Sequence, residues 1–183
     1  IVYKYNAGSK KFAKLASVSG NSYIVLSLPS AQRDKYKVRA VIAASTATVS
    51  SRYSAEFTAV CAPEKVSVVI SSSIKTNGYV LSWPKVKNAN GYTVFKFDAK
   101  SGKFVKLAST AKTSYTVSSL SAGTENIYAV RAYVTQGGKT YSGVLSDEMV
   151  ASTLPPQVKR ISQKKTSVSG YTLSWGRVKG ADG

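Results

Sequence analysis

The most constraining feature of this chain is a sequence that recurs at a constant distance of 92 residues. Residues Ile1–Ala7 match Thr93–Ala99, and Gly78-Tyr-Val-Leu-Ser-Trp83 matches Gly170-Tyr-Thr-Leu-Ser-Trp175. No insertion or deletion interrupts the match from end to end. Self-similarity at a fixed offset is the signature of tandem copies of one structural unit. The chain is therefore predicted to be an array of domains, each about 90 residues long.

The residue types predict that each unit is all-β. Short alternating runs rich in Val, Ile, Tyr, Thr and Ser recur between Gly, Ser, Asn and Pro, and no window carries an extended helical stripe. A unit of this size can bury one core without a metal or a disulfide. The single cysteine, Cys61, has Thr153 as its counterpart one period later, so no disulfide is expected to recur with the repeat.

One complete unit is predicted in the middle of the chain, and its seven short strands with turn signals between them indicate a β-sandwich. The expected strands are Lys65–Ser71, Gly78–Trp83, Gly91–Phe97, Lys103–Ser109, Ser114–Ser118, Asn126–Val134 and Asp147–Thr153.

Several residues of this unit follow a known pattern. Leu81-Ser-Trp83, Gly91-Tyr92-Thr-Val94, Gly123-Thr124 and Tyr128 together resemble the core of a fibronectin type III domain, an immunoglobulin-like fold. The resemblance implies that Trp83 ends strand B, that Tyr92 and Val94 point inward on strand C, and that Tyr128 begins strand F. Large aromatic side chains with a polar group are ordinary core residues in sandwiches, so we expect Trp83 and Tyr128 in the core, where the N–H and the O–H can find partners near the rim.

Aligned on this frame, the chain divides into three segments. Residues 1–62 correspond to a partial unit with strands C to G, residues 63–154 to the complete unit, and residues 155–183 to a partial unit with strands A and B. The array continues beyond both ends, or residues 155–183 of one molecule complete residues 1–62 of the next, head to tail, which would generate a fibre. With no initiator Met or signal peptide, the chain is expected to be an excerpt of a longer protein.

Positive charge is spread over all three segments. The formal net charge is +18, with +7, +6 and +5 in residues 1–62, 63–154 and 155–183. Such a field favours salt-sensitive association with polyanions, such as wall teichoic acids, acidic polysaccharides or nucleic acid, and it also keeps a long array soluble. We do not expect nucleic acid to be the partner, because no stacking module of the RNA-binding kind is visible.

Strand alternation predicts an outward face that combines rings and cations. If Tyr92, Val94, Val105, Leu107, Tyr128, Val130 and Ala132 point inward, their neighbours point outward. The candidate contact surface is Phe95, Phe97, Phe104, Lys106, Arg131 and Tyr133, with Tyr3, Tyr5, Phe12, Lys14, Arg39 and Val41 at the matching positions of the first copy. These residues could stack sugars, bind anionic polymers, pack against a neighbouring unit, or stabilise a solvated sheet as cross-strand pairs.

The chain lacks the groups on which catalysis usually depends. It contains no His, and its eight carboxylates suggest no catalytic pair. Gly137-Gly138 is predicted to form a turn between strands F and G, not a phosphate-binding loop. We therefore predict a protein that is not an enzyme, with no catalytic, cofactor-binding or metal site, and we find no apolar run long enough to cross a membrane.

These observations predict a structural repeat of an extracellular or cell-surface protein. The Lys-, Ser- and Tyr-rich texture resembles the tandem fibronectin type III-like domains of bacterial, Gram-positive-like secreted proteins. The expected partners are neighbouring copies or adjacent domains of a longer chain. A polysaccharide or cell-wall polyanion bound by the outward face is the alternative function, and non-specific nucleic-acid binding is a second. Pro155-Pro156 restricts the connection between units, which favours a semi-rigid rod.

Overall fold

The computed structural model describes residues 1–43 and 47–181, which form strands, turns and irregular segments without a helix. The prediction of an all-β chain is confirmed. Two compact units can be distinguished, one of Ile1–Lys65, Val86–Asn90 and Ala132–Val144, and one of Val66–Lys85, Gly91–Arg131 and Leu145–Gly183. The boundaries predicted after residues 62 and 154 stay a prediction.

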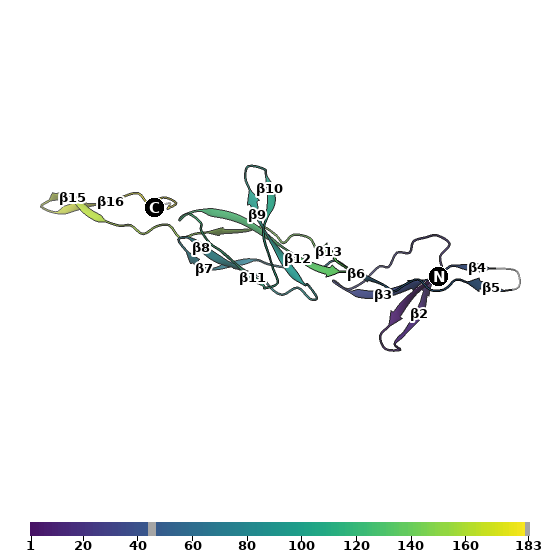
Figure 1. Cartoon of the computed structure of the whole chain (residues 1–183). Helices are drawn as coiled ribbons and strands as arrows, with labels where there is room; N and C mark the ends of the chain where they lie inside the picture. The colour runs from purple at the N-terminus through teal and green to yellow at the C-terminus, as the bar shows by residue number, and fades with distance from the viewer. Residues whose placement is uncertain (44–46, 182–183) are drawn as a thin grey trace. The chain divides into compact units, whose positions relative to one another are not determined.

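The first copy of the repeat builds a four-stranded antiparallel sheet (Figure 1). Its strands lie in the order β2-β1-β3-β6, which corresponds to the family order C′, C, F and G. A separate hairpin pairs two short strands. The bounds are β1 (Val2–Asn6), β2 (Lys11–Ala16), β3 (Arg33–Val38) and β6 (Phe57–Val60) in the sheet, and β4 (Val41–Ala43) and β5 (Thr48–Ser50) in the hairpin.

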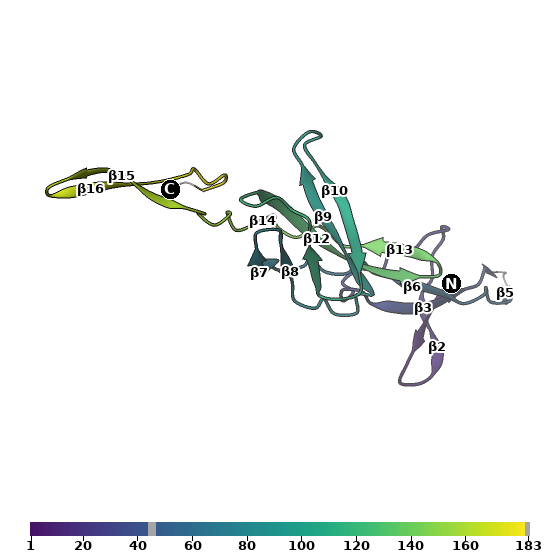
Figure 2. The ribbon, with the colours of Figure 1, turned by 60° about the vertical axis from the view of Figure 1, so that its left-hand side comes forward.

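The second copy builds the same sheet with the same strand order. The path is β10-β9-β12-β13, with β14 also paired to β12 (Figure 2). Strand G is thus divided in two, and its first part, β13, was not predicted from the sequence. The turn predicted at Gly137-Gly138 joins β12 to β13, and both glycines have positive φ. The bounds are β9 (Gly91–Asp98), β10 (Lys103–Thr110), β12 (Glu125–Gln136), β13 (Lys139–Ser142) and β14 (Met149–Ser152).

A further sheet completes the sandwich of the second copy. It has the order β11-β8-β7, with bounds β7 (Ile70–Lys75), β8 (Gly78–Ser82) and β11 (Ser114–Val117). Alternate residues of β8, β9 and β12 are fully buried between this three-stranded sheet and the five-stranded sheet that contains β9 and β12. The core includes Tyr79, Leu81, Val117, Tyr92, Val94, Tyr128 and Val130, so the inward positions predicted on β9 and β12 are confirmed.

Two tyrosines join the two sheets of this sandwich through their hydroxyl groups. Tyr79 of β8 donates a hydrogen bond of 2.9 Å to the Tyr128 hydroxyl on β12, and the two rings pack edge to face at 6.0 Å. Burial, together with this hydrogen bond, raises the pKa of Tyr128 well above its usual range. The hydroxyl predicted to find a partner does so.

The second aromatic core residue, Trp83, packs differently from Tyr128. Trp83 is buried and its ring packs on Tyr92 with centroids 5.4 Å apart, but its Nε1 has no hydrogen-bond partner among the described residues. The predicted core position of Trp83 is confirmed. The indole packs as an apolar group, and its N–H is buried with it.

Strand A begins later than predicted. The expected strand over 65–71 is replaced by β7 at Ile70–Lys75, although Val66 and Val69 are both buried. These two valines supply apolar area to the core, although residues 63–69 lie outside the assigned strands. The apolar pattern predicted the buried positions correctly but placed the start of the hydrogen-bonded strand too early in the sequence.

The inward positions predicted on β10 are also wrong. Val105 and Leu107 are exposed, with exposed fractions of 52% and 41%. Val105 pairs with Lys96, beyond Val94, which is the last buried residue of β9. Leu107 lies in the register irregularity between Lys106 and Ala108, which breaks the alternation of faces.

The last two strands form a hairpin at the third occurrence of the repeat. β15 (Ile161–Ser167) pairs antiparallel with β16 (Gly170–Trp175), as expected for strands A and B. Every residue of the hairpin except Ser174 is exposed. The same stretch of sequence is therefore buried once and exposed once within this chain.

Candidate contact surface

The outward face of the first copy is held together by an arginine between two rings. The Arg39 guanidinium lies 5.3 Å from the ring centroid of Tyr3 and 5.2 Å from that of Tyr53. The two rings also meet edge to face at 5.0 Å. Tyr3, predicted to be an exposed contact residue, is consequently buried, with an exposed fraction of 7%. Strand alternation could not show this, because Tyr53 comes from a segment outside the sheet.

A second aromatic pair continues this face. Tyr5 and Phe12 are cross-strand partners on β1 and β2, and their rings meet edge to face at 5.3 Å. The Lys37 ammonium lies 4.6 Å from the Phe12 centroid, and the Lys35 ammonium lies 5.8 Å from that of Tyr5. Both lysines also lie within 3.6 Å of the Glu56 carboxylate. The face is thus a ladder of rings and cations that pack on one another.

The opposite face of the same sheet carries a polar cluster. Asp34 on β3 is nearly buried and pairs with the Lys4 ammonium of β1 at 2.9 Å. Gln32 donates to the same carboxylate at 3.0 Å, and the Tyr36 hydroxyl donates at 3.4 Å. Burial opposes ionisation of Asp34, but the hydrogen bonds from Lys4 and Gln32 outweigh it and lower its pKa. Their mutual interaction raises the pKa of Lys4.

The second copy presents a simpler version of the outward face. Phe97 and Phe104 are cross-strand partners with ring centroids 5.5 Å apart. The Arg131 guanidinium lies 5.0 Å from the centroid of Phe95. Lys106 is exposed and stands opposite Phe95 in the register of β9 and β10. Tyr133, half-buried, follows Arg131 by two residues in β12.

The structure therefore brings most of the predicted surface together as cross-strand pairs. Sequence reasoning missed Lys35, Lys37 and Tyr53, which complete the ladder of the first copy. The two lysines alternate with inward residues on β3, so the alternation that identified Arg39 could also have identified them. Val41 is exposed and lies in the hairpin strand β4, outside the four-stranded sheet.

The surface offers ring faces and cationic groups for contact. Cations already lie on several of the ring faces, and the exposed charged groups are lysines such as Lys14 and Lys106. In residues 1–43 and 47–181, no group of three His, Cys, Asp or Glu side chains is placed to hold a metal ion. The part of the chain that the structure describes also contains no helix of the length and hydropathy needed to cross a bilayer.

Comparison with known proteins finds similarity in structure only. No family model matches the sequence, and no curated protein matches it. Similar solved structures include a variant of FN3tt, at 26% identity over 50% of this chain and 94% of that one, with a TM-score of 0.39. A domain of human fibronectin type III domain containing protein 3 is 20% identical over 52% and 89%, with a TM-score of 0.44.

A two-domain segment is similar over a larger part of the chain. The two fibronectin type III domains of chicken tenascin are 16% identical over 83% of each chain, with a TM-score of 0.49. The fold assignment itself depends on the strand order, the register and the core described above. Two packed antiparallel sheets with this strand order make an immunoglobulin-like sandwich of the fibronectin type III kind.

Proposed function

We propose that this chain is a structural repeat of an extracellular or cell-surface protein, in which each 92-residue unit acts as a spacer and building block. The observation that carries the proposal is the repetition of one sheet. The order C′-C-F-G and the ladder of rings and cations on its outward face both recur at the same offset. Repetition of a whole folding unit is what a spacer needs, because each added copy adds length without a new fold.

The setting on a bacterial surface is supported by the resemblance in sequence texture. The Lys-, Ser- and Tyr-rich composition resembles that of such secreted arrays, and the Pro155-Pro156 connection favours a semi-rigid rod.

Force spectroscopy tests the spacer function directly. A concatemer of four copies of residues 63–154, pulled from its ends, should unfold in steps that each release roughly 30 nm of chain, since about 92 residues extend to ~3.4 Å each. Steps of this size show independently folded mechanical units. Extension without discrete steps would show that the unit does not bear load, and the proposal would then be wrong.

Binding of a wall polyanion is the second candidate function, and the exposed lysines of the outward face favour it. Lys14 and Lys106 occupy matching positions of the two copies and are both exposed. The rings beneath contact Arg or Lys side chains of the protein itself, so ionic contact is favoured over sugar stacking. The double variant Lys14→Ala/Lys106→Ala should lower retention on teichoic acid and flatten its dependence on salt.

A matched variant separates charge from stacking. Phe95→Ala/Phe104→Ala/Tyr133→Ala removes rings of the second copy and leaves the net charge unchanged. If retention depends on the rings, this variant loses it and the lysine variant keeps it, which would favour a neutral polysaccharide. Equal retention of duplex DNA and teichoic acid at every salt concentration would instead favour the non-specific nucleic-acid binder.

A further inference from the structure

Both copies of the repeat carry a lysine, an aromatic ring and an arginine across strands C′, C and F of the same sheet. In the second copy Lys106 of β10 stands opposite Phe95 of β9, and the Arg131 guanidinium of β12 lies 5.0 Å from the Phe95 ring centroid. The equivalent residues of the first copy are Lys14, Tyr3 and Arg39. Each of these two sets, called here a Lys-ring-Arg row, places one cation on either side of a ring.

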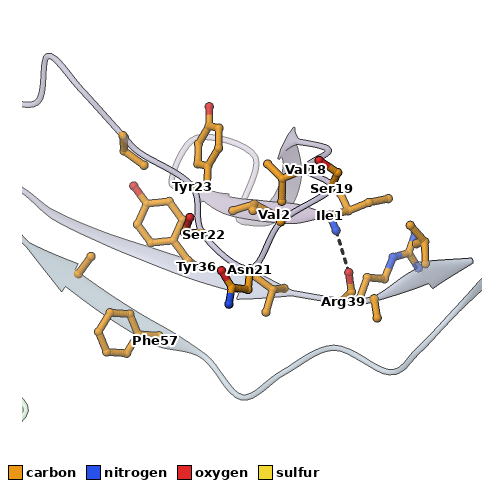
Figure 3. A pocket seen from close by; sticks show the side chains of 16 residues that line it. Ile1, Val2, Val18, Ser19, Asn21, Ser22, Tyr23, Tyr36, Arg39 and Phe57 are labelled. Atoms are coloured by element: carbon orange, nitrogen blue, oxygen red, sulfur yellow. Dashed lines mark hydrogen bonds between the residues drawn. The ribbon is translucent and has the colours of Figure 1, made fainter.

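The sheet fixes the position of the arginine in the first row. Figure 3 shows Arg39 beside Ile1, whose nitrogen donates to the Arg39 carbonyl oxygen at 2.8 Å. The Arg39 N–H donates in return to the Ile1 carbonyl oxygen at 3.1 Å. This reciprocal pair extends the ladder in which Val2 stands opposite Val38 by one residue. Arg39 is then diagonal to Tyr3, at a separation that a long side chain spans.

A β-bulge follows the lysine in both rows. In the second copy the pairing of β10 with β9 skips Leu107, directly after Lys106. In the first copy the pairing of β2 with β1 skips Leu15, directly after Lys14. Bulges of this kind re-aim side chains and are frequent beside functional sites. The bulge belongs to the repeat unit and sets the position of the lysine relative to the ring.

Neither arginine is neutralised by the described part of the protein. The Nε atoms of Arg39 and Arg131 are buried and have no hydrogen-bond partner there. The ion pairs of residues 1–43 and 47–181 engage Lys4, Lys35 and Lys37 and leave both guanidinium groups without a carboxylate. A guanidinium has five N–H donors in a rigid fork and is always charged. The ring holds this fork in place, and its donors remain available to an acceptor from outside.

A phosphodiester group supplies such an acceptor. The guanidinium fork binds two phosphate oxygens at once, and Lys106 adds a point charge beside it. Bases of single-stranded nucleic acid bind by stacking on a free ring face, and a sugar ring would need the same surface. In the second copy the Arg131 guanidinium lies over the Phe95 ring and takes that surface. The row therefore favours a polyanion without rings, such as a chain of polyol and phosphate.

We propose that the Lys-ring-Arg row of each copy binds one phosphodiester group of a polyol phosphate polymer, with the arginine as the anchoring residue. This inference rests on the proposed binding of a wall polyanion, and it names the chemical group that is recognised and the residue that recognises it. The row is part of the repeat unit, so each copy that carries it contributes one such site.

The second copy offers the more accessible of the two sites. In the first copy the Tyr53 ring also lies on the Arg39 guanidinium, with its centroid 5.2 Å away. At the matching position the second copy has Leu145. Glu56 binds two lysines beside the first row and adds a negative charge that repels an anion. Replacement of Arg131 should therefore weaken binding more than replacement of Arg39.

Charge-preserving substitutions test the anchoring role. The full chain carries Arg131→Lys or Arg39→Lys, and calorimetric titration with poly(glycerol phosphate) at physiological ionic strength gives the affinity. Lysine keeps the charge but lacks the fork, so Arg131→Lys should weaken binding roughly tenfold, and Arg39→Lys should weaken it less. Lys106→Ala removes one exposed charge and should weaken binding about two- to fivefold. Thermal unfolding establishes that each variant is folded.

The matched control for lost charge is Lys75→Ala, which removes an exposed lysine from β7 in the opposite sheet of the second copy. It should change the affinity by less than about twofold, because exposed charges outside the site are screened. The proposal is wrong if Arg131→Lys binds like the unaltered chain, or if Lys75→Ala weakens binding as much as Lys106→Ala does. Tighter binding of oligo(dT) than of poly(glycerol phosphate) would also overturn it, in favour of nucleic acid.

The same titrations separate failure of the anchor from failure of the wider function. If the unaltered chain does not bind poly(glycerol phosphate), both the anchor and the binding of a wall polyanion are wrong. If the unaltered chain binds and Arg131→Lys binds equally well, only the anchor is wrong. The spacer function is tested by force on residues 63–154 and depends on neither result.

Discussion

The inner faces of the two copies of the repeat present the same residues in opposite environments. Val130 is fully buried in the second copy, whereas its counterpart Val38 is half exposed in the first. The strand order of the sheet is identical in both. The same strand order therefore occurs with its inner face covered in the second copy and half exposed in the first.

The largest expected effect is the difference between two equivalent leucines. Leu81→Ala removes a fully buried side chain and should destabilise the second copy by about 2–5 kcal/mol. Leu173→Ala removes its exposed counterpart and should leave that unfolding transition unchanged. Urea denaturation followed by Trp fluorescence measures both. Equal losses for the two variants would contradict the comparison.

Removal of a tyrosine hydroxyl should also destabilise the second copy more than the first, by a smaller margin than the leucine substitutions. Tyr79→Phe removes a hydroxyl buried between the sheets and leaves the Tyr128 hydroxyl without its donor, which should cost about 1–3 kcal/mol. Tyr36→Phe removes only a 3.4 Å contact with Asp34 in a partly exposed site, so its effect should be within about 0.5 kcal/mol. Thermal unfolding of the two variants checks the ranking, and a larger loss for Tyr36→Phe would reverse the account.

The turn between strands C and C′ allows the two copies to be compared at a position outside the core. Gly102 has φ of 64° in the second copy, and Lys10 has φ of 53° at the same place in the first. A residue with a Cβ is strained in this region, so Lys10→Gly should stabilise the first copy by up to about 1 kcal/mol. Gly102→Lys should destabilise the second by a similar amount. Chemical denaturation of each variant tests the pair, and a destabilised Lys10→Gly variant or a stabilised Gly102→Lys variant would refute the account.

The smallest expected effect depends on pH. The folded-state pKa of Asp34 is lowered, so its stabilising contribution is present above the unfolded pKa of about 3.9 and disappears as the pH falls through the folded value. The contribution should be below about 1 kcal/mol, because the Lys4 partner is one-third exposed. Asp34→Asn should remove this acid dependence from the first copy when stability is measured from pH 5 to pH 2. Persistence of the same dependence in the variant would assign it to another carboxylate.

Much of the fold follows from local patterns in the sequence. Alternation on β9 and β12 correctly separated Tyr92, Val94 and Tyr128 from their outward neighbours, because both strands are regular where they cross the core. Alternation failed at Leu107, where an irregularity shifts the register, and at Val105, where the hairpin extends past the buried part of β9. The alternation of residue types along one strand cannot show where the register shifts or where a strand extends beyond the core.

The candidate surface was only partly predictable, for a different reason. The outward positions on β1, β2 and β3 followed from alternation, but the burial of Tyr3 depends on Tyr53, which lies 50 residues away and outside the sheet. The guanidinium of Arg39 then fills the space between the two rings. Long-range contacts of this kind change an exposed position into a buried one without altering the strand pattern.

The two tryptophans provide the most direct test, because they occupy the same position of the repeat at Trp83 and Trp175. The chain labelled with 5-fluorotryptophan, diluted until it is monomeric by size-exclusion chromatography, should give two ¹⁹F resonances. We predict that one resonance, from Trp83, is insensitive to exchange of H₂O for D₂O, since its exposed fraction is 5%, and that the other shifts, since that of Trp175 is 60%. Two insensitive resonances, or a shifting resonance assigned to Trp83, would contradict the claim that equivalent positions of the repeat differ in burial.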